Sequence, residues 1–239
     1  MSVALSVVVP VKDEAANVGP LVREIAAALA NEAPHEILFI DDGSSDGTAG
    51  ALAALKAEIP ALRVLRHPRN LGQSRGIRSG VMAARGGIII TLDGDGQNDP
   101  ADIPKLLRVL EAEAEVGLVS GVRTKRKDTA SRRLASKLGN GLRNWILQDG
   151  AADTGCGLKA FRRDLFQAMP YFDHIHRYLI ALTLREGWQV RFVPVNHRPR
   201  TAGQSKYTNF GRLLVSGADL LGVRWLMRRH RGRAGVEEL

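Results

Sequence analysis

Short apolar runs alternate with helical patterns along the first 92 residues, and this alternation constrains the fold more than any other feature. Four runs are too short for a helix and rich in β-branched side chains, as buried strands are. The expected strands are residues 4–10, 35–40, 62–65 and 87–92. Apolar residues at helical spacing predict helices at 17–31 and 76–84, and another should follow the loop at 41–48. The pattern predicts an α/β fold with a mainly parallel sheet and helices on both faces.

The last of these runs is followed by two carboxylates. Asp93 and Asp95 come directly after Ile88-Ile89-Ile90-Thr91-Leu92, and the glycines around them allow a sharp turn where open α/β sheets bind ligands. With Gln97 they offer the hard oxygen ligands that Mg²⁺ or Mn²⁺ take, with positions left for water and phosphate oxygens. The alternative is a Gly/Asp-rich turn whose carboxylates are solvated.

Carboxylates also follow the earlier strands, Glu14 after the first and Asp41-Asp42 after the second. The carboxyl ends of parallel strands lie side by side at one crevice, which is the usual ligand position in such sheets. This convergence favours a nucleotide and metal site over a solvated turn. Asp46 lies in a Ser/Asp/Gly-rich loop before a helix, and we expect it to cap that helix.

Composition narrows the class of protein. The 239 residues, 44% of them hydrophobic, suit one large domain or one domain with a small appendage. Lys and Arg (34) exceed Asp and Glu (25) by 9, which favours an anionic partner. The single cysteine, Cys156, fits a reducing compartment, and beside glycines it is expected to be a small packed residue. With no signal-peptide pattern and no apolar run near the roughly 18 residues of a membrane span, we expect a cytoplasmic protein.

Motifs of the N-terminal half resemble those of the inverting family 2 glycosyltransferases of the A-type nucleotide-sugar fold. They are Val8-Val9-Pro10-Val11-Lys12-Asp13-Glu14, Ile40-Asp41-Asp42-Gly43-Ser44-Ser45-Asp46-Gly47-Thr48, the segment from Asn70-Leu71-Gly72 to Gly80, and Leu92-Asp93-Gly94-Asp95-Gly96-Gln97. The substrate-binding residues implied are Pro10, Lys12, Glu14, Ile40, Asp42, Asp93 and Gly94, and the implied ligands of Mg²⁺ or Mn²⁺ are Asp95, Gln97 and Asp93. Many relatives carry an aromatic residue and an asparagine at Lys12 and Asp13, so a stacking contact to the base is expected to be missing.

Two later signatures resemble the dolichol-phosphate mannose synthase branch, whose bacterial members use undecaprenyl phosphate. The first is Asp153-Thr154-Gly155-Cys156-Gly157-Leu158-Lys159-Ala160-Phe161-Arg162, and the second is the Arg-x-x-Gly-x-Ser-Lys pattern from Arg200 to Lys206. With them the resemblance covers nearly the whole chain to Tyr207. It implies inverting transfer of a sugar from a GDP- or UDP-linked donor to a polyprenyl phosphate, undecaprenyl or dolichyl.

Basic side chains are expected to hold the phosphates in this reaction. The expected catalytic residues are Asp93, Asp95, Arg123 and Arg200, and the further substrate-binding residues are Arg132, Arg162 and Lys206. An acceptor phosphate is already ionised and needs no strong general base, so positioning by arginine forks suffices. The alternative acceptor, a sugar or glycolipid hydroxyl in envelope polysaccharide or lipid A assembly, would require a carboxylate base. Taken alone, the basic segment 125–133 is typical of a solvated loop.

A basic, amphipathic helical tail, residues 208–239, is expected after a catalytic domain at residues 1–207. Its apolar residues fall on one helical face, and arginines follow. Asp219 would cost about 2.5–3.5 kcal/mol at a bilayer centre, so interfacial helices are expected rather than a span. Together with a basic helix expected at 131–148, the tail is expected to dock peripherally on the cytoplasmic membrane. The alternative is packing on the domain or on a second subunit of a homo-oligomer.

Two other classes explain the sequence less well. A nucleotidyltransferase is expected to have a Gly-rich loop after the first strand, where this chain has Pro10 to Glu14. A nucleic-acid-binding protein would account for the charge, but aromatic residues make up only 5% and no binding motif occurs, so no nucleic acid partner is expected. Mannose, glucose, galacturonate and a modified aminoarabinose all fit the motifs.

Overall fold

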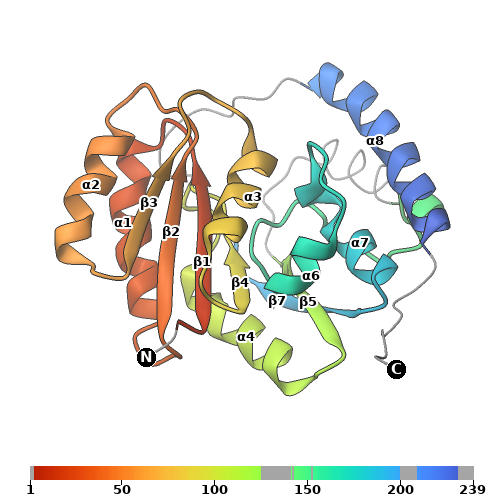
Figure 1. Ribbon diagram of the computed structural model, residues 1–239, viewed down its shortest axis with the longest axis horizontal. Helices are drawn as coiled ribbons and strands as arrows, with labels where there is room; N and C mark the ends of the chain where they lie inside the picture. Colours follow the sequence, from red (N-terminus) through yellow and green to blue (C-terminus); the bar gives the residue numbers. More distant parts are fainter. Residues whose placement is uncertain (1–2, 125–140, 142, 152, 200–208, 231–239) are drawn as a thin grey trace, which may run out of the picture.

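One seven-stranded sheet organises the structure (Figure 1). The computed structural model describes residues 3–124, 141, 143–151, 153–199 and 209–230, with the backbone alone for 209–216. The strands are β1 (Leu5–Val11), β2 (His35–Asp41), β3 (Leu62–Arg66), β4 (Ile88–Thr91), β5 (Val116–Arg123), β6 (Lys159–Arg162) and β7 (Gln189–Val195). Their order is β3-β2-β1-β4-β6-β5-β7. Only β6 among these strands runs antiparallel to its neighbours, so the sheet is mainly parallel, as predicted.

Helices cover both faces of this sheet. They are α1 (Ala15–Ala28), α2 (Thr48–Glu58), α3 (Gln73–Ala83), α4 (Ile103–Ala112), α6 (Arg163–Ala168), α7 (Leu179–Arg185) and α8 (Asn209–Arg229), with 3₁₀ turns η1 (Pro100–Asp102) and η2 (Ile175–Arg177). Alternate strand residues enter two separate cores: Val7 and Val9 pack with α1, α2 and α4, while Val8 packs with α3, α6 and α7. The prediction of helices on both faces is therefore confirmed.

The elements of the first 92 residues follow the sequence prediction closely. Strands β1 to β4 differ from the predicted ranges by at most one residue at either end. Helix α3 begins earlier than expected, at Gln73, because Gly72 adopts a left-handed conformation (φ +89°) that ends the preceding loop directly before it. A side chain at this φ would be strained, so the glycine sets where the helix starts.

Helix α8 packs on α7 and the core beneath it, at the far end of the molecule from α2 (Figure 1). Val223 is buried, the Arg224 Nη1 donates to the Ile146 carbonyl at 2.6 Å, and the Arg185 Nε donates to the Leu226 carbonyl at 3.2 Å. Within the ranges described, no helix has the length and apolar character of a membrane span. The helix expected at 131–148 lies mostly outside those ranges.

Candidate active site

A cavity of about 820 Å³ opens at the carboxyl ends of β1, β2 and β4. Because these strands are parallel, the loops that leave them meet at one edge of the sheet. Most of the predicted substrate and metal residues of the N-terminal half line this cavity: Pro10, Lys12, Glu14, Asp42, Asp93, Gly94, Asp95 and Gln97. Gly94 allows the loop after β4 to approach β1 closely, since an added Cβ would stand 2.4 Å from a Val11 methyl group.

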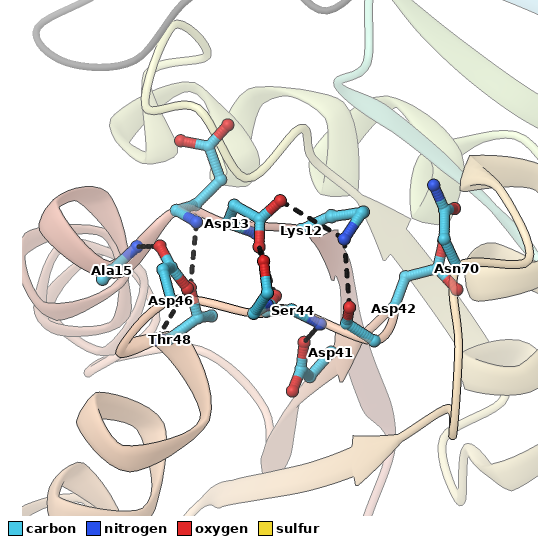
Figure 2. Close-up of polar contacts among 12 residues, drawn as sticks. Lys12, Asp13, Ala15, Asp41, Asp42, Ser44, Asp46, Thr48 and Asn70 are labelled. Atoms are coloured by element: carbon cyan, nitrogen blue, oxygen red, sulfur yellow. Dashed lines mark hydrogen bonds and ion pairs between the residues drawn. The ribbon is translucent and has the colours of Figure 1, made fainter.

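The loops after β1 and β2 are tied to one another beside this cavity (Figure 2). Lys12 Nζ donates to the Gly43 carbonyl at 3.0 Å and lies 3.2 Å from the Asp13 carboxylate. Asp13 has φ +52°, and its Oδ1 accepts a 2.8 Å hydrogen bond from the Ser45 amide. Its own amide donates to the Ser44 Oγ at 2.9 Å. These contacts fix Lys12 and Asp13, the two positions at which a stacking contact to the base is expected to be missing.

Asp46 caps two helices at once. Its carboxylate accepts from the Thr48 amide at 2.9 Å, at the start of α2, and from the Ala15 amide at 3.1 Å, at the start of α1 (Figure 2). Burial by itself would raise the pKa of Asp46, but these hydrogen bonds and one from the Thr48 hydroxyl lower it overall. The predicted capping role of Asp46 is confirmed, and it extends to a second helix.

Asp42 is buried at the start of the loop after β2 and holds the turn before α3. Its Oδ1 accepts from the Leu71 amide at 2.9 Å and from the His67 ring at 2.7 Å, and its Oδ2 accepts from the Gly72 amide at 2.8 Å. The carboxylate thereby holds the turn that leads into α3. Asn70, next to this turn, also lines the cavity.

Asp93 lies where the loop after β4 meets α3. Gln73 Nε2 donates to the Asp93 Oδ1 at 2.7 Å, and the backbone amide of Asp93 donates to the Asn98 Oδ1 at 3.1 Å. Burial and the neighbouring Asp95 carboxylate raise the pKa of Asp93 to about 6, against the opposing charges of Lys159 and Arg123. Two adjacent carboxylates that disfavour each other's charge are a setting that a cation relieves.

The donor set of this loop fits a divalent metal ion. Asp93, Asp95 and Gln97 supply hard oxygens, and Mg²⁺ commonly takes one or two carboxylates together with water and substrate phosphates. No cluster of three or more His, Cys, Asp or Glu side chains that could hold a metal occurs in the described ranges. The three side chains are compatible with an open metal site that water and phosphate oxygens complete.

Arg198 clamps this loop from the end of β7. Its amide donates to the Gln97 carbonyl at 2.9 Å, and its guanidinium pairs with Glu24 at 2.6 Å and with Asp99 at 2.7 Å. The chain after β7 is therefore held beside Gln97 at Arg198. Arg200 and Lys206 themselves, like Arg132, lie outside the described residues.

Arg123 stands behind the cavity wall rather than in it. Its Nε and Nη2 each donate to the Asp153 carboxylate at 2.7 Å, and its amide donates there at 3.2 Å. Burial alone would lower its pKa, but Asp153 raises it overall. An added Cβ on Gly155 would stand 2.9 Å from Arg123 Nη2, so the arginine supports the 153–157 segment. Direct contact of Arg123 with phosphate stays a prediction.

Two predicted substrate-binding residues are placed elsewhere, and both predictions are corrected here. Ile40 is fully buried and packs against α3 near Gly80, because alternation along β2 turns its side chain into the core. Arg162 is paired with Ile88, at the opposite end of β4 from the cavity, and its Nε donates to the Val116 carbonyl at 3.0 Å. The motifs identify the segments, but not which face or end each side chain occupies.

Several cavity residues were not among the predicted site residues, although Lys159 lies inside the signature from Asp153 to Arg162. Lys159 is a buried lysine whose Nζ donates to the Cys156 carbonyl, and burial lowers its pKa. The cavity wall also includes Asp173, His174, His176 and Arg177, which come from the segment around η2. This segment follows no strand end and carries no recognised motif, so spacing could not reveal it.

Cys156 is buried, as expected of a packed residue. Its thiol donates to the Leu158 carbonyl at 3.8 Å, and burial raises its pKa. A thiol with a raised pKa is a poor nucleophile, so packing accounts for its position.

Comparisons with known proteins agree with this geometry. Residues 6–169 match glycosyl transferase family 2. The chain is 37% identical, over 98% of its length and 70% of the relative's, to a dodecaprenyl-phosphate galacturonate synthase of Rhizobium johnstonii. It is 36% identical, over 91% of its length and 66% of the relative's, to an undecaprenyl-phosphate 4-deoxy-4-formamido-L-arabinose transferase of Enterobacter sp.. The chain thus spans about two thirds of the length of these relatives.

Solved structures share the fold. Glucosyl-3-phosphoglycerate synthase of Mycobacterium tuberculosis, in complex with Mn²⁺, UDP and glucosyl-3-phosphoglycerate, superposes with a TM-score of 0.72 at 18% identity. The match covers 97% of this chain and 81% of that one. The same enzyme with Mg²⁺ and UDP also gives a TM-score of 0.72, at 17% identity. At such identities the likeness establishes the fold, which is the predicted A-type glycosyltransferase architecture.

Proposed function

The chain belongs to glycosyltransferase family 2, and from that premise we propose that it transfers a sugar, with inversion, from a nucleotide diphosphate sugar to a polyprenyl phosphate. The observation that carries the proposal is that Asp42 and the Asp93–Asp95 pair meet in one cavity, at the ends of the two strands that flank β1. Similarity to two polyprenyl-phosphate sugar transferases over at least nine tenths of the chain supports the choice of acceptor.

Two groups of described residues are proposed to bind the two parts of the donor nucleotide. Pro10, Lys12, Glu14 and Asp42 would receive the nucleoside, and Asp93, Asp95 and Gln97 would hold Mg²⁺ or Mn²⁺ at the diphosphate. When bound, such an ion stabilises the negative charge that the leaving nucleoside diphosphate develops. These residues would thereby fix the donor with its anomeric carbon turned towards the acceptor.

The acceptor phosphate would attack that carbon from the face opposite the leaving group. One phosphate oxygen forms the new C–O bond with an electron pair of its own, while the bond to the donor phosphate breaks and its electrons leave with the nucleoside diphosphate. The acceptor is already ionised, so no proton has to be removed. Catalysis then depends on positioning and on charge, which basic side chains supply.

The proposal is tested with purified enzyme, undecaprenyl phosphate and a panel of GDP- and UDP-sugars, with lipid products identified by mass spectrometry. A lipid-linked sugar from one donor, formed with Mg²⁺ or Mn²⁺ and lost in EDTA, is the expected result. Transfer to a sugar or glycolipid hydroxyl, with none to the lipid phosphate, would overturn the acceptor. Full activity in EDTA would overturn the metal.

We further infer peripheral association with the cytoplasmic membrane. Three large apolar side chains are strongly exposed near the packed end of α8: Trp145 (77%), Leu221 (68%) and Trp225 (57%). The contact between Arg224 and Ile146 brings their two segments together, and Arg228 and Arg229 on α8 are exposed as well. Apolar side chains beside arginines suit the interface of an anionic bilayer.

Liposome flotation tests the membrane inference on the full chain. Replacing Trp145, Leu221 and Trp225 by serine is expected to reduce binding to anionic liposomes at low and at high salt, because the apolar contribution does not depend on screening. Met82→Ser is the matched control, since Met82 is 54% exposed on α3. Equal flotation of the triple variant and the control would remove this patch from membrane binding.

A further inference from the structure

The segment around η2 forms a rigidly held wall of the cavity. His174 Nδ1 lies 2.9 Å from the Asp219 carboxylate on α8, and His176 Nδ1 lies 2.7 Å from the Ser74 hydroxyl on α3. Ser74 is adjacent to Gln73, whose amide bonds to Asp93. The wall is therefore anchored on two helices, α3 and α8. Its anchor on α3, Ser74, is next to Gln73, which hydrogen-bonds to the Asp93 carboxylate.

Arg177 is the next residue in this wall, and its backbone is fixed on both sides. Its amide donates to the His174 carbonyl at 3.0 Å, and its own carbonyl accepts from Arg143 Nη2 at 3.4 Å. Arg143 is itself paired with the buried Asp149 at 2.5 Å. The position at which the Arg177 side chain leaves the wall is thus set by the surrounding structure.

The Arg177 guanidinium, in contrast, makes no hydrogen bond or ion pair with any residue that the structure describes, although it lines the cavity and is half-buried. The other described cations at the cavity are committed. Lys12 donates to the Gly43 carbonyl, and Lys159 donates to the Cys156 carbonyl. Arg123, behind the wall, is held by both oxygens of Asp153.

A partly desolvated guanidinium that extends from a fixed backbone and has no partner among the described residues is a prepared site for an oxyanion, because its planar fork matches carboxylate and phosphate oxygens. Asp93 and Asp95 line the same cavity. Their negative charge disfavours an anion at their end unless a cation is bound there, whereas Arg177 attracts one to its own wall.

We propose that Arg177 binds an oxyanion of a substrate: the acceptor phosphate or a carboxylate on the transferred sugar. This inference rests on the proposed function and adds to it a positively charged residue that contacts the substrate in the same cavity as the carboxylate pair. Both ligands present the same chemistry to the guanidinium. They differ in whether the anion arrives with the acceptor or with the donor.

The test measures binding and turnover separately in the full chain. Citronellyl phosphate, a short soluble polyprenyl phosphate, and the donor pair UDP-galacturonate and UDP-galactose are titrated calorimetrically into wild-type protein, Arg177→Gln and Arg177→Lys. Arg108→Gln is the matched control, since Arg108 is exposed on α4 and outside the cavity. Melting temperatures equal to wild type show that the variants fold.

Arg177→Gln is expected to weaken binding of its ligand about 10- to 100-fold, with Arg177→Lys in between, because a charge-assisted bidentate contact is lost. Weaker citronellyl phosphate binding with unchanged donors would assign the acceptor phosphate. Weaker UDP-galacturonate binding with unchanged UDP-galactose would assign a sugar carboxylate. In the assigned case KM for that substrate rises more than kcat falls, which a structural defect would not produce.

Unchanged binding of all three ligands by Arg177→Gln, or failure of wild-type protein to bind either anion, would overturn the inference. A failure of the proposed function looks different. Wild-type protein would then form no lipid-linked sugar from any donor, whether or not Arg177 governs the binding of an anion.

Discussion

Gly157 lies directly against the carboxylate of Asp93, and one added methyl group there tests whether the position of that carboxylate controls the reaction. A Cβ on Gly157 would stand 2.3 Å from Asp93 Oδ2 and 2.4 Å from its Cγ. A carbon and an oxygen that are not bonded stay about 3.3 Å apart, so the carboxylate must shift by about 1 Å. The backbone of Gly157 is restrained, since its carbonyl accepts a 2.9 Å hydrogen bond from the Thr91 hydroxyl on β4.

For Gly157→Ala we expect a fall in turnover of about 100-fold, because a displacement of about 1 Å in an active site can cost that much. Overpacking of this kind costs about 1–3 kcal/mol of stability. In a chain of this size each kcal/mol lowers the melting temperature by about 2–4 °C. The variant is therefore expected to fold, to melt a few degrees earlier and to turn over slowly.

The assay compares initial rates of sugar transfer at saturating acceptor with melting temperatures from the same samples. Gly50→Ala is the matched control, because nothing lies within 4 Å of its added Cβ on the exposed side of α2. It should keep the wild-type rate and gain slight stability from the better helix former. In an Asp93→Ala background, Gly157→Ala should cost no further stability, since the clashing carboxylate is gone. Wild-type turnover in a folded Gly157→Ala protein would refute the reasoning.

Other perturbations separate the cavity from the rest of the fold. Asp95→Asn is expected to lower turnover at least 100-fold without lowering the melting temperature, because a charged metal ligand becomes neutral. Initial rates of wild type and variant across a Mn²⁺ titration measure the loss. Burial alone would raise the pKa of Glu36, but its hydrogen bonds, the largest from Ser6, lower it overall. The stabilisation by Glu36 is therefore complete above its unfolded pKa and is lost as pH falls through the lower folded value. The difference in melting temperature between wild type and Glu36→Gln should shrink below about pH 4. The kcat of Glu36→Gln at pH 7 should equal that of wild type. Asp219→Ala removes the contact between α8 and His174 in the cavity wall. It is expected to raise the KM for a substrate about fivefold, as the loss of one hydrogen bond would. A KM equal to wild type would show that α8 does not support this wall.

The sequence by itself was sufficient for the architecture of the N-terminal half and for its carboxylate cluster. Runs such as Ile88-Ile89-Ile90 are strands because β-branched side chains favour the pleated backbone, and their length excludes helices. Once the strands are parallel, their carboxyl ends must meet, so Asp42, Asp93 and Asp95 reach one cavity from distant positions in the chain. The resemblance to family 2 glycosyltransferases rests on the same residues, and the family match confirms it.

Tertiary structure alone decided which side chains of the second half reach the cavity. Arg162 was predicted to bind substrate, yet it donates to carbonyl groups at the opposite end of the sheet, while Arg123 is paired with Asp153 and its contact with phosphate stays a prediction. Arg177, in contrast, has no motif but lines the cavity. Local preferences act over a few neighbouring residues, whereas the partner and the direction of a long basic side chain depend on register and on helices packed from elsewhere in the chain. The sequence therefore determines where the carboxylates converge, and only packing determines which cations face them.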